Sequence, residues 1–110
     1  MRDDATQLRK GVLELAILAL LHETSRYGGE IVASLGQYEG LEAGAGTVYP
    51  LLTRLAKAGL LETQWKESPV GPPRKYYAIT AQGRDALTAQ TRVWRTMNSA
   101  LESLLGGPHV

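Results

Sequence analysis

The feature that most constrains the fold is a pair of short runs joined by a loop rich in proline and glycine. Residues 60–66 alternate in polarity with a period of about two, and residues 76–80 form a second run of β-forming side chains. The segment between them, residues 67–75, reads ESPVGPPRK. Two such runs around a Pro/Gly loop predict a β-hairpin with a long, positively flanked tip.

Three helical segments precede this hairpin. Apolar residues recur at steps of three and four over residues 8–21 and again over residues 28–38. A third helix is expected to begin near Gly44 or Thr47, either of which is placed to cap it. It is expected to end just before Gly59, which is placed to close the helix in a left-handed conformation. The order helix, helix, turn, helix, hairpin is the layout of a winged helix-turn-helix domain.

One long helix follows the hairpin. Thr80 is its expected N-cap, and helical sequence continues to about Leu105. Its apolar side chains follow a heptad seam in which Gln90 is the one polar member; the seam residues are Leu87, Trp94, Met97, Leu101 and Leu104. A helix of this length is longer than the rest of a small domain can cover. We expect the seam to pack on a second copy of the chain; packing on the chain's own first helix, or a shared arrangement, are the alternatives.

Composition excludes several classes of protein. A chain of 110 residues without cysteine forms one domain and has no disulfide, thiolate metal site or cysteine nucleophile. Its two histidines, His22 and His109, argue against a metal site, and no arrangement of residues suggests an enzyme or a cofactor. The longest apolar run, residues 12–21, is too short to span a membrane, and the first residues lack the layout of a signal peptide. We therefore expect a soluble, cytoplasmic, non-enzymatic protein.

Positive charge is concentrated in the middle of the chain. The net charge is only +1, but residues 46–77 hold five Lys or Arg against two Asp or Glu. These five cations lie on the third helix and the hairpin: Arg54, Lys57, Lys66, Arg74 and Lys75. In a winged helix-turn-helix domain, the third helix enters the major groove and the hairpin contacts the flanking backbone or minor groove. Cations at these places neutralise phosphates, so the layout predicts DNA binding.

Three motifs make the chain similar to the PadR family of transcriptional regulators. Residues 8–21 (LRKGVLELAILALL) resemble the family's opening helix, and residues 46–61 (GTVYPLLTRLAKAGLL) resemble its recognition helix. Residues 71–83 (GPPRKYYAITAQG) resemble its wing strand and the start of its last helix. The resemblance implies a winged helix-turn-helix DNA-binding domain in residues 1–79. Residues 80–110 then form a single C-terminal dimerisation helix with a tail, as in the smaller of the family's two architectural types.

This resemblance also implies a function. The expected protein is a dimeric repressor that binds a pseudo-palindromic operator, with the N-terminal helix supporting the dimer. Some relatives release DNA when a planar aromatic or phenolic compound binds near the dimer interface. The chain departs from the family at Gly44, where many relatives have a polar cap, and at Gly29, where an aromatic residue is common. Loss of the cap hydroxyl removes one possible phosphate contact.

The site residues follow from this layout. We expect DNA contacts from the exposed face of the third helix and from the hairpin, namely Thr47, Tyr49, Pro50, Thr53, Arg54, Lys57, Arg74 and Lys75. The seam of the last helix is the expected dimer interface. Within it, Trp94 either forms interface core or lines a slot for a flat ligand. Trp65 is expected to pack under the hairpin. A hypothesis of another class is a module that docks a protein partner through the same helix and hairpin.

Overall fold

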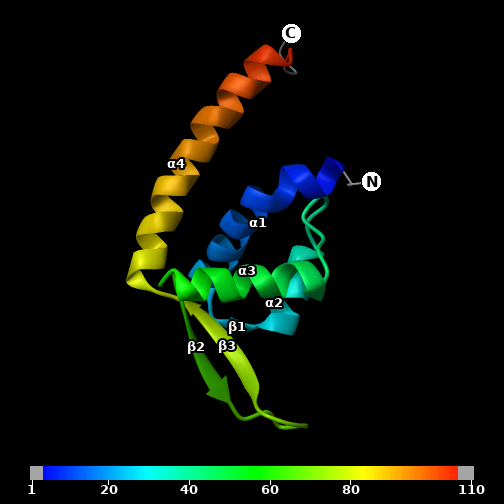
Figure 1. Cartoon of the computed structure of the whole chain (residues 1–110), viewed down its shortest axis with the longest axis vertical. Helices are drawn as coiled ribbons and strands as arrows, with labels where there is room; N and C mark the ends of the chain where they lie inside the picture. Colours follow the sequence, from blue (N-terminus) through cyan, green and yellow to red (C-terminus); the bar gives the residue numbers. More distant parts are fainter. Residues whose placement is uncertain (1–3, 107–110) are drawn as a thin grey trace.

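The structure of the protein is a computed structural model that describes residues 4–106, with side chains described from residue 11 onward. It contains four helices and a small sheet within overall dimensions of 53 × 33 × 24 Å. In Figure 1, α1 and α4 diverge upward like the arms of a V, α3 runs across the middle, and the sheet projects from the opposite end. The elements are α1 (Asp4–Glu23), β1 (Arg26–Tyr27), α2 (Gly28–Leu35), α3 (Ala45–Lys57), β2 (Leu61–Lys66), β3 (Arg74–Ile79) and α4 (Ala81–Leu104).

The core lies where α1, α2 and α3 meet the base of the sheet. α1 is buried on several sides, as its nearly continuous apolar sequence predicts, and it starts four residues earlier than expected. α2 ends at Leu35 rather than near residue 38, because the chain turns at once through Gly36 and then Gly40, which has a φ of +91°. The buried core side chains are Leu13, Ile17, Leu18, Leu20, Leu21, Ile31, Leu35, Val48, Leu52, Leu55, Leu61, Tyr77 and Ile79.

The ends of α3 are set by two glycines. Gly44 is the N-cap, with no side chain to bond the first turn, so Thr47 lies inside the helix. Gly59 has a φ of +83°, and its N–H donates to the Ala56 carbonyl while the Leu60 N–H donates to the Leu55 carbonyl, both at 3.0 Å. This is a Schellman ending, which confirms the predicted cap. The reversal at Gly59 directs the chain straight into β2.

The predicted hairpin is present within a sheet of three antiparallel strands in the order β1-β3-β2. β2 and β3 pair from Leu61 opposite Ile79 to Lys66 opposite Arg74. β1 adds a third strand of two residues, in which Tyr27 pairs with Tyr76. The fold is therefore mainly helical with a small hairpin, as expected, plus one short strand.

The start of α4 is locked to the end of α3. Thr80 caps α4: its hydroxyl accepts from the Gly83 N–H at 2.9 Å and donates to the Gly59 carbonyl at 2.7 Å. Gly83 is buried, and a Cβ there would collide with the Leu60 carbonyl oxygen and lie 2.7 Å from Ile79 Cγ1. The close approach fixes the direction in which α4 leaves the sheet. α4 packs against α1 and then extends beyond it (Figure 1).

Candidate nucleic-acid interface

The residues predicted to contact DNA from α3 are all exposed. Val48, Leu52 and Leu55 anchor one side of the helix in the core. At 100° per residue, the opposite side is formed by Pro50, Thr53 and Lys57. Tyr49 lies on one flank, and Thr47 and Arg54 lie on the other. α3 therefore presents a polar outer face with two distinct flanks.

Arg54, on the same flank as Thr47, has a partner that no sequence pattern indicates. Its guanidinium group forms an ion pair with the carboxylate of Glu14 on α1. The Arg54 side chain is 65% exposed, whereas the Glu14 side chain is only 19% exposed. Because the two residues are far apart in the sequence, no local spacing indicates this contact.

Tyr49, on the flank opposite to Arg54, packs against the first residue of α2. A Cβ on Gly28 would lie 2.6 Å from the Tyr49 hydroxyl oxygen, so the absence of a side chain at Gly28 makes room for the ring. Tyr49 nevertheless stays exposed to solvent. Burial raises the pKa of the nearby Tyr77 hydroxyl above its ordinary value of 10, and the Tyr49 hydroxyl raises it further. Tyr49 thus both packs within the protein and faces outward.

The cations of the hairpin lie over aromatic rings. The Lys66 Nζ is 4.6 Å from the centroid of the Tyr76 ring, and the Arg74 Cζ is 4.4 Å from the centroid of the Tyr27 ring. On the other face of the hairpin, the Lys75 Nζ is 5.8 Å from the Tyr77 ring. Such contacts restrain long side chains that otherwise sample many conformations. Lys66 is therefore restrained in the same way as Arg74 and Lys75, the two hairpin cations that were predicted to contact DNA.

A groove of about 360 Å³ separates the start of α3 from the hairpin. It is lined by aromatic and cationic side chains together with one glycine: Tyr27, Gly28, Tyr49, Trp65, Arg74, Lys75 and Tyr77. Trp65 is 66% exposed, so the expectation that it packs under the hairpin is wrong. The physical reason is that the hairpin projects past the helices, and only Leu61 at the base of β2 reaches the core.

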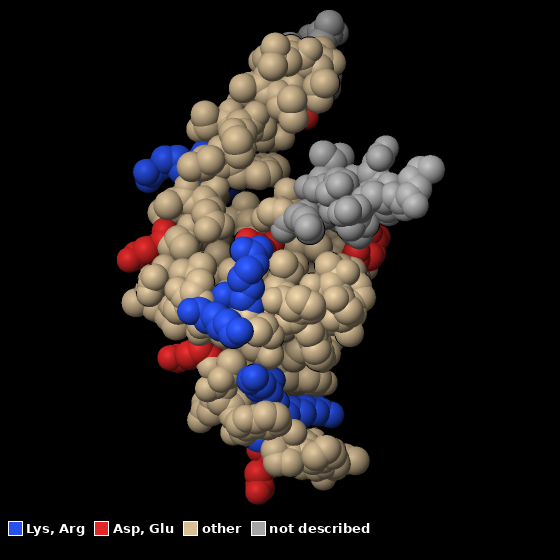
Figure 2. Space-filling view, viewed as in Figure 1, with Lys and Arg blue, Asp and Glu red and all other residues tan. Residues whose placement is uncertain are grey.

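Positive side chains follow one line across the molecule. Figure 2 shows Lys and Arg from the middle of this face, over α3, down to the hairpin. The cations that the structure exposes on these elements are Arg54, Lys57, Lys66, Arg74 and Lys75. The acidic groups seen in this view lie mostly toward the edges of the face. α3 and the β2–β3 hairpin, hereafter the wing, thus share one cationic surface.

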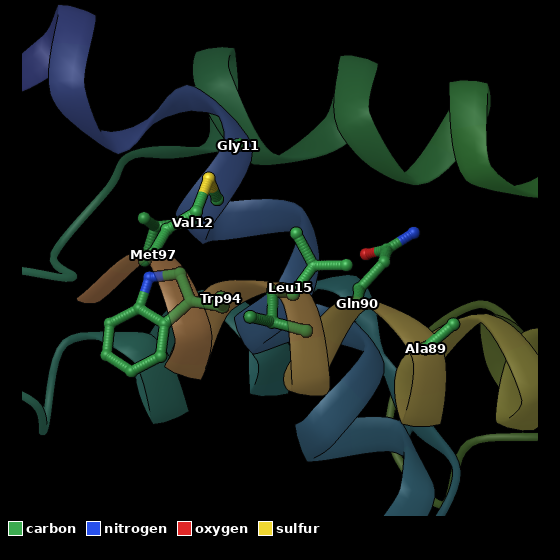
Figure 3. A pocket seen from close by; sticks show the side chains of 8 residues that line it. Gly11, Val12, Leu15, Ala89, Gln90, Trp94 and Met97 are labelled. Carbon is green, nitrogen blue, oxygen red and sulfur yellow. The ribbon is translucent and has the colours of Figure 1, made fainter. Parts of the chain in front are cut away.

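A second, apolar surface runs along α4. Leu87 is half-buried against the core of its own chain, whereas the rest of the predicted seam is exposed: Trp94, Met97, Leu101 and Leu104. A groove of about 380 Å³ between α1 and α4 is lined by Gly11, Val12, Leu15, Ala89, Gln90, Val93, Trp94 and Met97. In Figure 3, Trp94 and Met97 lie beside Val12. The base of the seam therefore packs within the chain, and the rest faces outward.

Two further results concern only the described residues. They contain no group of three or more His, Cys, Asp or Glu that could hold a metal ion. Among them, no helix is both long enough and apolar enough to cross a membrane.

A helix with a polar outer face beside a cationic antiparallel hairpin defines a winged helix-turn-helix protein of the DNA-binding class. Residues 17–89 match the transcriptional regulator PadR-like family, and the chain belongs to that family. This membership confirms the resemblance drawn from the sequence. It also agrees with a role in transcription regulation rather than in catalysis.

Solved structures agree with the family in both sequence and fold. A PadR-like transcriptional regulator from Bacillus cereus is 37% identical, with a TM-score of 0.82, over 92% of this chain and 98% of that chain. A PadR-like transcription factor from Bacteroides fragilis is 40% identical, with a TM-score of 0.76, over 90% of this chain and 95% of that chain. A further relative is known by sequence: an uncharacterized protein of Lysinibacillus sphaericus is 28% identical over 100 residues, which are 89% of this chain and 92% of that protein.

Proposed function

We propose that the protein represses transcription in the cytoplasm as a homodimer that binds a pseudo-palindromic operator. The observation that supports this most strongly is the single surface shared by the outer face of α3 and the wing cations (Figure 2). In the proposed complex, α3 enters the major groove and the wing lies on the flanking backbone or minor groove. The proposed contacting residues are Thr47, Tyr49, Pro50, Thr53, Arg54, Lys57, Arg74 and Lys75, and we add Lys66 and Trp65 because both are exposed on the same hairpin.

In the proposed complex, the contacts made by the wing and those made by α3 serve different purposes. Arg74 and Lys75 are placed to neutralise phosphates, which supplies affinity for any duplex. Thr53 and Arg54 lie on the helix that enters the groove, where base edges are read. Discrimination between sequences is therefore assigned to α3, and general affinity is assigned mainly to the wing.

The dimer is assigned to the exposed part of α4. Met97 is 58% exposed and Leu101 is 53% exposed in the single chain. A contiguous row of exposed apolar side chains on a small protein marks a site of association. In the proposed dimer two such rows pair, with α1 supporting them, and the two recognition helices are expected about 34–36 Å apart, one turn of duplex. A two-fold dimer of this kind matches a pseudo-palindromic operator.

The groove between α1 and α4 supports a further part of the proposal, which is release of DNA by a flat aromatic compound. Trp94 offers an indole face for stacking, and Val12 and Met97 supply apolar contact beside it (Figure 3). We expect planar phenolic compounds to quench tryptophan fluorescence in the parent but not in Trp94→Ala, in which Trp65 remains as the reporter. Equal quenching in both proteins would contradict a site at Trp94.

The experiment that tests the DNA-binding proposal is a titration of the protein into a labelled duplex from upstream of its own gene, followed by anisotropy. An unrelated duplex of equal length is the control. Binding of the upstream duplex that is tighter than the control and weakens with salt is expected. Equal, weak binding to both would contradict the assignment of this duplex as operator. Salt-insensitive capture of a protein partner through the same face would favour the docking module instead.

A further inference from the structure

We propose that Glu14 of α1 is a positioning residue for DNA recognition, because it holds Arg54 of α3 in one direction and so sharpens discrimination between operator and other DNA. The inference rests on the proposed DNA-binding function of α3. It concerns a carboxylate outside the recognition helix and the wing, on α1, to which the proposed function assigns no contact with DNA.

The ion pair joins the largely buried carboxylate of Glu14 to the exposed guanidinium group of Arg54. Glu14 follows Leu13 on α1 and precedes Ile17 and Leu18 by one turn, and all three apolar residues are buried in the core. The Glu14 side chain is 19% exposed, so its charge has lost most of its water. A carboxylate in such a place is costly to leave without a partner. Glu14 therefore keeps Arg54 tethered.

The ion pair with Glu14 leaves most of the Arg54 side chain accessible to solvent. The Arg54 side chain is 65% exposed while it is paired with Glu14. A guanidinium group carries five N–H donors in a rigid fork, and a carboxylate engages only part of them. The part of Arg54 that Glu14 does not engage is therefore accessible to DNA while the ion pair links α3 to α1.

A fixed direction matters for bases more than for phosphates. A forked contact with a base edge needs both donors in register, whereas a phosphate accepts a cation from many directions. Ordering the side chain in advance also lowers the entropy lost when DNA binds. Lys57, in the last turn of the same helix, is exposed and forms no ion pair within the described residues. Lys57 thus remains free to follow the backbone, and Arg54 is the residue held for sequence reading.

The same carboxylate acts against general affinity. Its negative charge lies beside a cation that would otherwise attract phosphates at full strength. Removal of the charge should therefore strengthen binding to arbitrary DNA while it weakens the preference for the operator. A residue that only stabilises the fold would not move these two quantities in opposite directions.

The test compares Glu14→Gln with Glu62→Gln, an exposed wing carboxylate on β2 whose loss changes the charge equally. Dissociation constants are measured for the upstream duplex and for a shuffled duplex at one salt concentration. Glu14→Gln should bind the shuffled duplex more tightly than the parent does. Its preference for the upstream duplex should fall about 5- to 10-fold, because the forked base contact of Arg54 is no longer held in one direction. Glu62→Gln should strengthen binding to both duplexes and keep the preference.

Two further variants show whether the effect passes through Arg54. In an Arg54→Ala background, Glu14→Gln should leave the preference unchanged; a further fall there would overturn the proposal. Arg54→Lys keeps the charge but removes the fork, so the preference should fall while binding to the shuffled duplex stays close to that of the parent. A preference that survives in both Arg54→Lys and Glu14→Gln would contradict the inference alone. A parent protein with no preference between the duplexes would contradict the proposed function instead.

Discussion

The guanidinium group of Arg74 lies over the ring of Tyr27, with 4.4 Å between the Arg74 Cζ and the ring centroid. Tyr27 belongs to the two-residue strand β1, and its ring also meets the Tyr76 ring edge-on at a centroid distance of 5.6 Å. A strand too short to add much hydrogen bonding thus places an aromatic surface under a wing cation. The loop end of the wing, where Arg74 lies, is therefore ordered by ring contacts, and Arg74 forms no ion pair among the residues that the structure describes.

Replacement of Tyr27 by leucine should weaken DNA binding through Arg74. A cation over an exposed ring contributes about 0.5–1 kcal/mol, which corresponds to a loss of about two- to fivefold in affinity for each wing. Tyr27→Phe keeps the ring and should bind DNA like the parent. Anisotropy titration at a fixed salt concentration gives both values. Equal affinities of the Leu and Phe variants would show that the ring does not support Arg74.

A charge in the exposed seam of α4 should separate the dimer. Leu101→Glu places a carboxylate where two apolar surfaces are proposed to meet, and burial of that charge without a partner is strongly unfavourable. Ser99→Glu adds the same charge on the opposite side of the helix and should leave the dimer intact. Sedimentation equilibrium gives the mass of each species. A dimeric Leu101→Glu protein would place the interface elsewhere.

A side chain at Gly83 should destabilise the fold more than one at Gly46. A Cβ on Gly83 meets the backbone carbonyl of Leu60, which can move only if α4 moves, so a loss of about 1–3 kcal/mol in unfolding free energy is expected. Gly46 lies on the exposed face of α3 with no other atom within 4 Å of its would-be Cβ. Gly46→Ala should therefore raise the unfolding free energy by about 0.5–1 kcal/mol. Urea denaturation of both variants tests the pair, and similar losses would contradict the packing described.

Stability should fall in strongly alkaline solution because of Tyr77. Burial, and then the Tyr49 hydroxyl, raise the pKa of Tyr77 above 10, so the folded protein holds this proton more tightly than the unfolded chain does. The stabilisation is fully present below pH 10 and is lost as pH rises through the folded-state pKa. Urea denaturation at pH 8 and pH 11 should show a smaller alkaline loss for Tyr77→Phe than for the parent. The control Tyr38→Phe removes an exposed tyrosine and should lose as much as the parent.

Local signals were sufficient for most of the architecture. Helical periodicity located four helices, Gly59 and Thr80 marked real caps, and the Pro/Gly loop marked a real hairpin. These features depend on neighbours within a few residues, which a single sequence contains. β1 was not predicted because a strand of two residues is too short to show an alternating pattern of polarity. Its existence depends on pairing with β3.

The contacts that order the candidate interface were not predictable in the same way. Only the packed fold brings the partners of these contacts together, as in the ion pair of Glu14 with Arg54 and the contact of Arg74 with the Tyr27 ring. Trp65 was expected to pack under the hairpin, but it is 66% exposed because the wing extends beyond any core that could receive it. The sequence indicated which surface carries positive charge, and the structure shows how those cations are held.

DNA binding through α3 and the wing requires that their cations neutralise phosphates, and the salt dependence of operator binding tests this requirement most directly. The slope of log K against log salt concentration should be steep for the parent dimer, at about 0.9 for each phosphate contact. Arg74→Ala combined with Lys75→Ala removes two cations from each protomer, so the slope should become shallower by about 3 to 4. An unchanged slope and affinity in the double variant would contradict the claim that the wing lies on DNA.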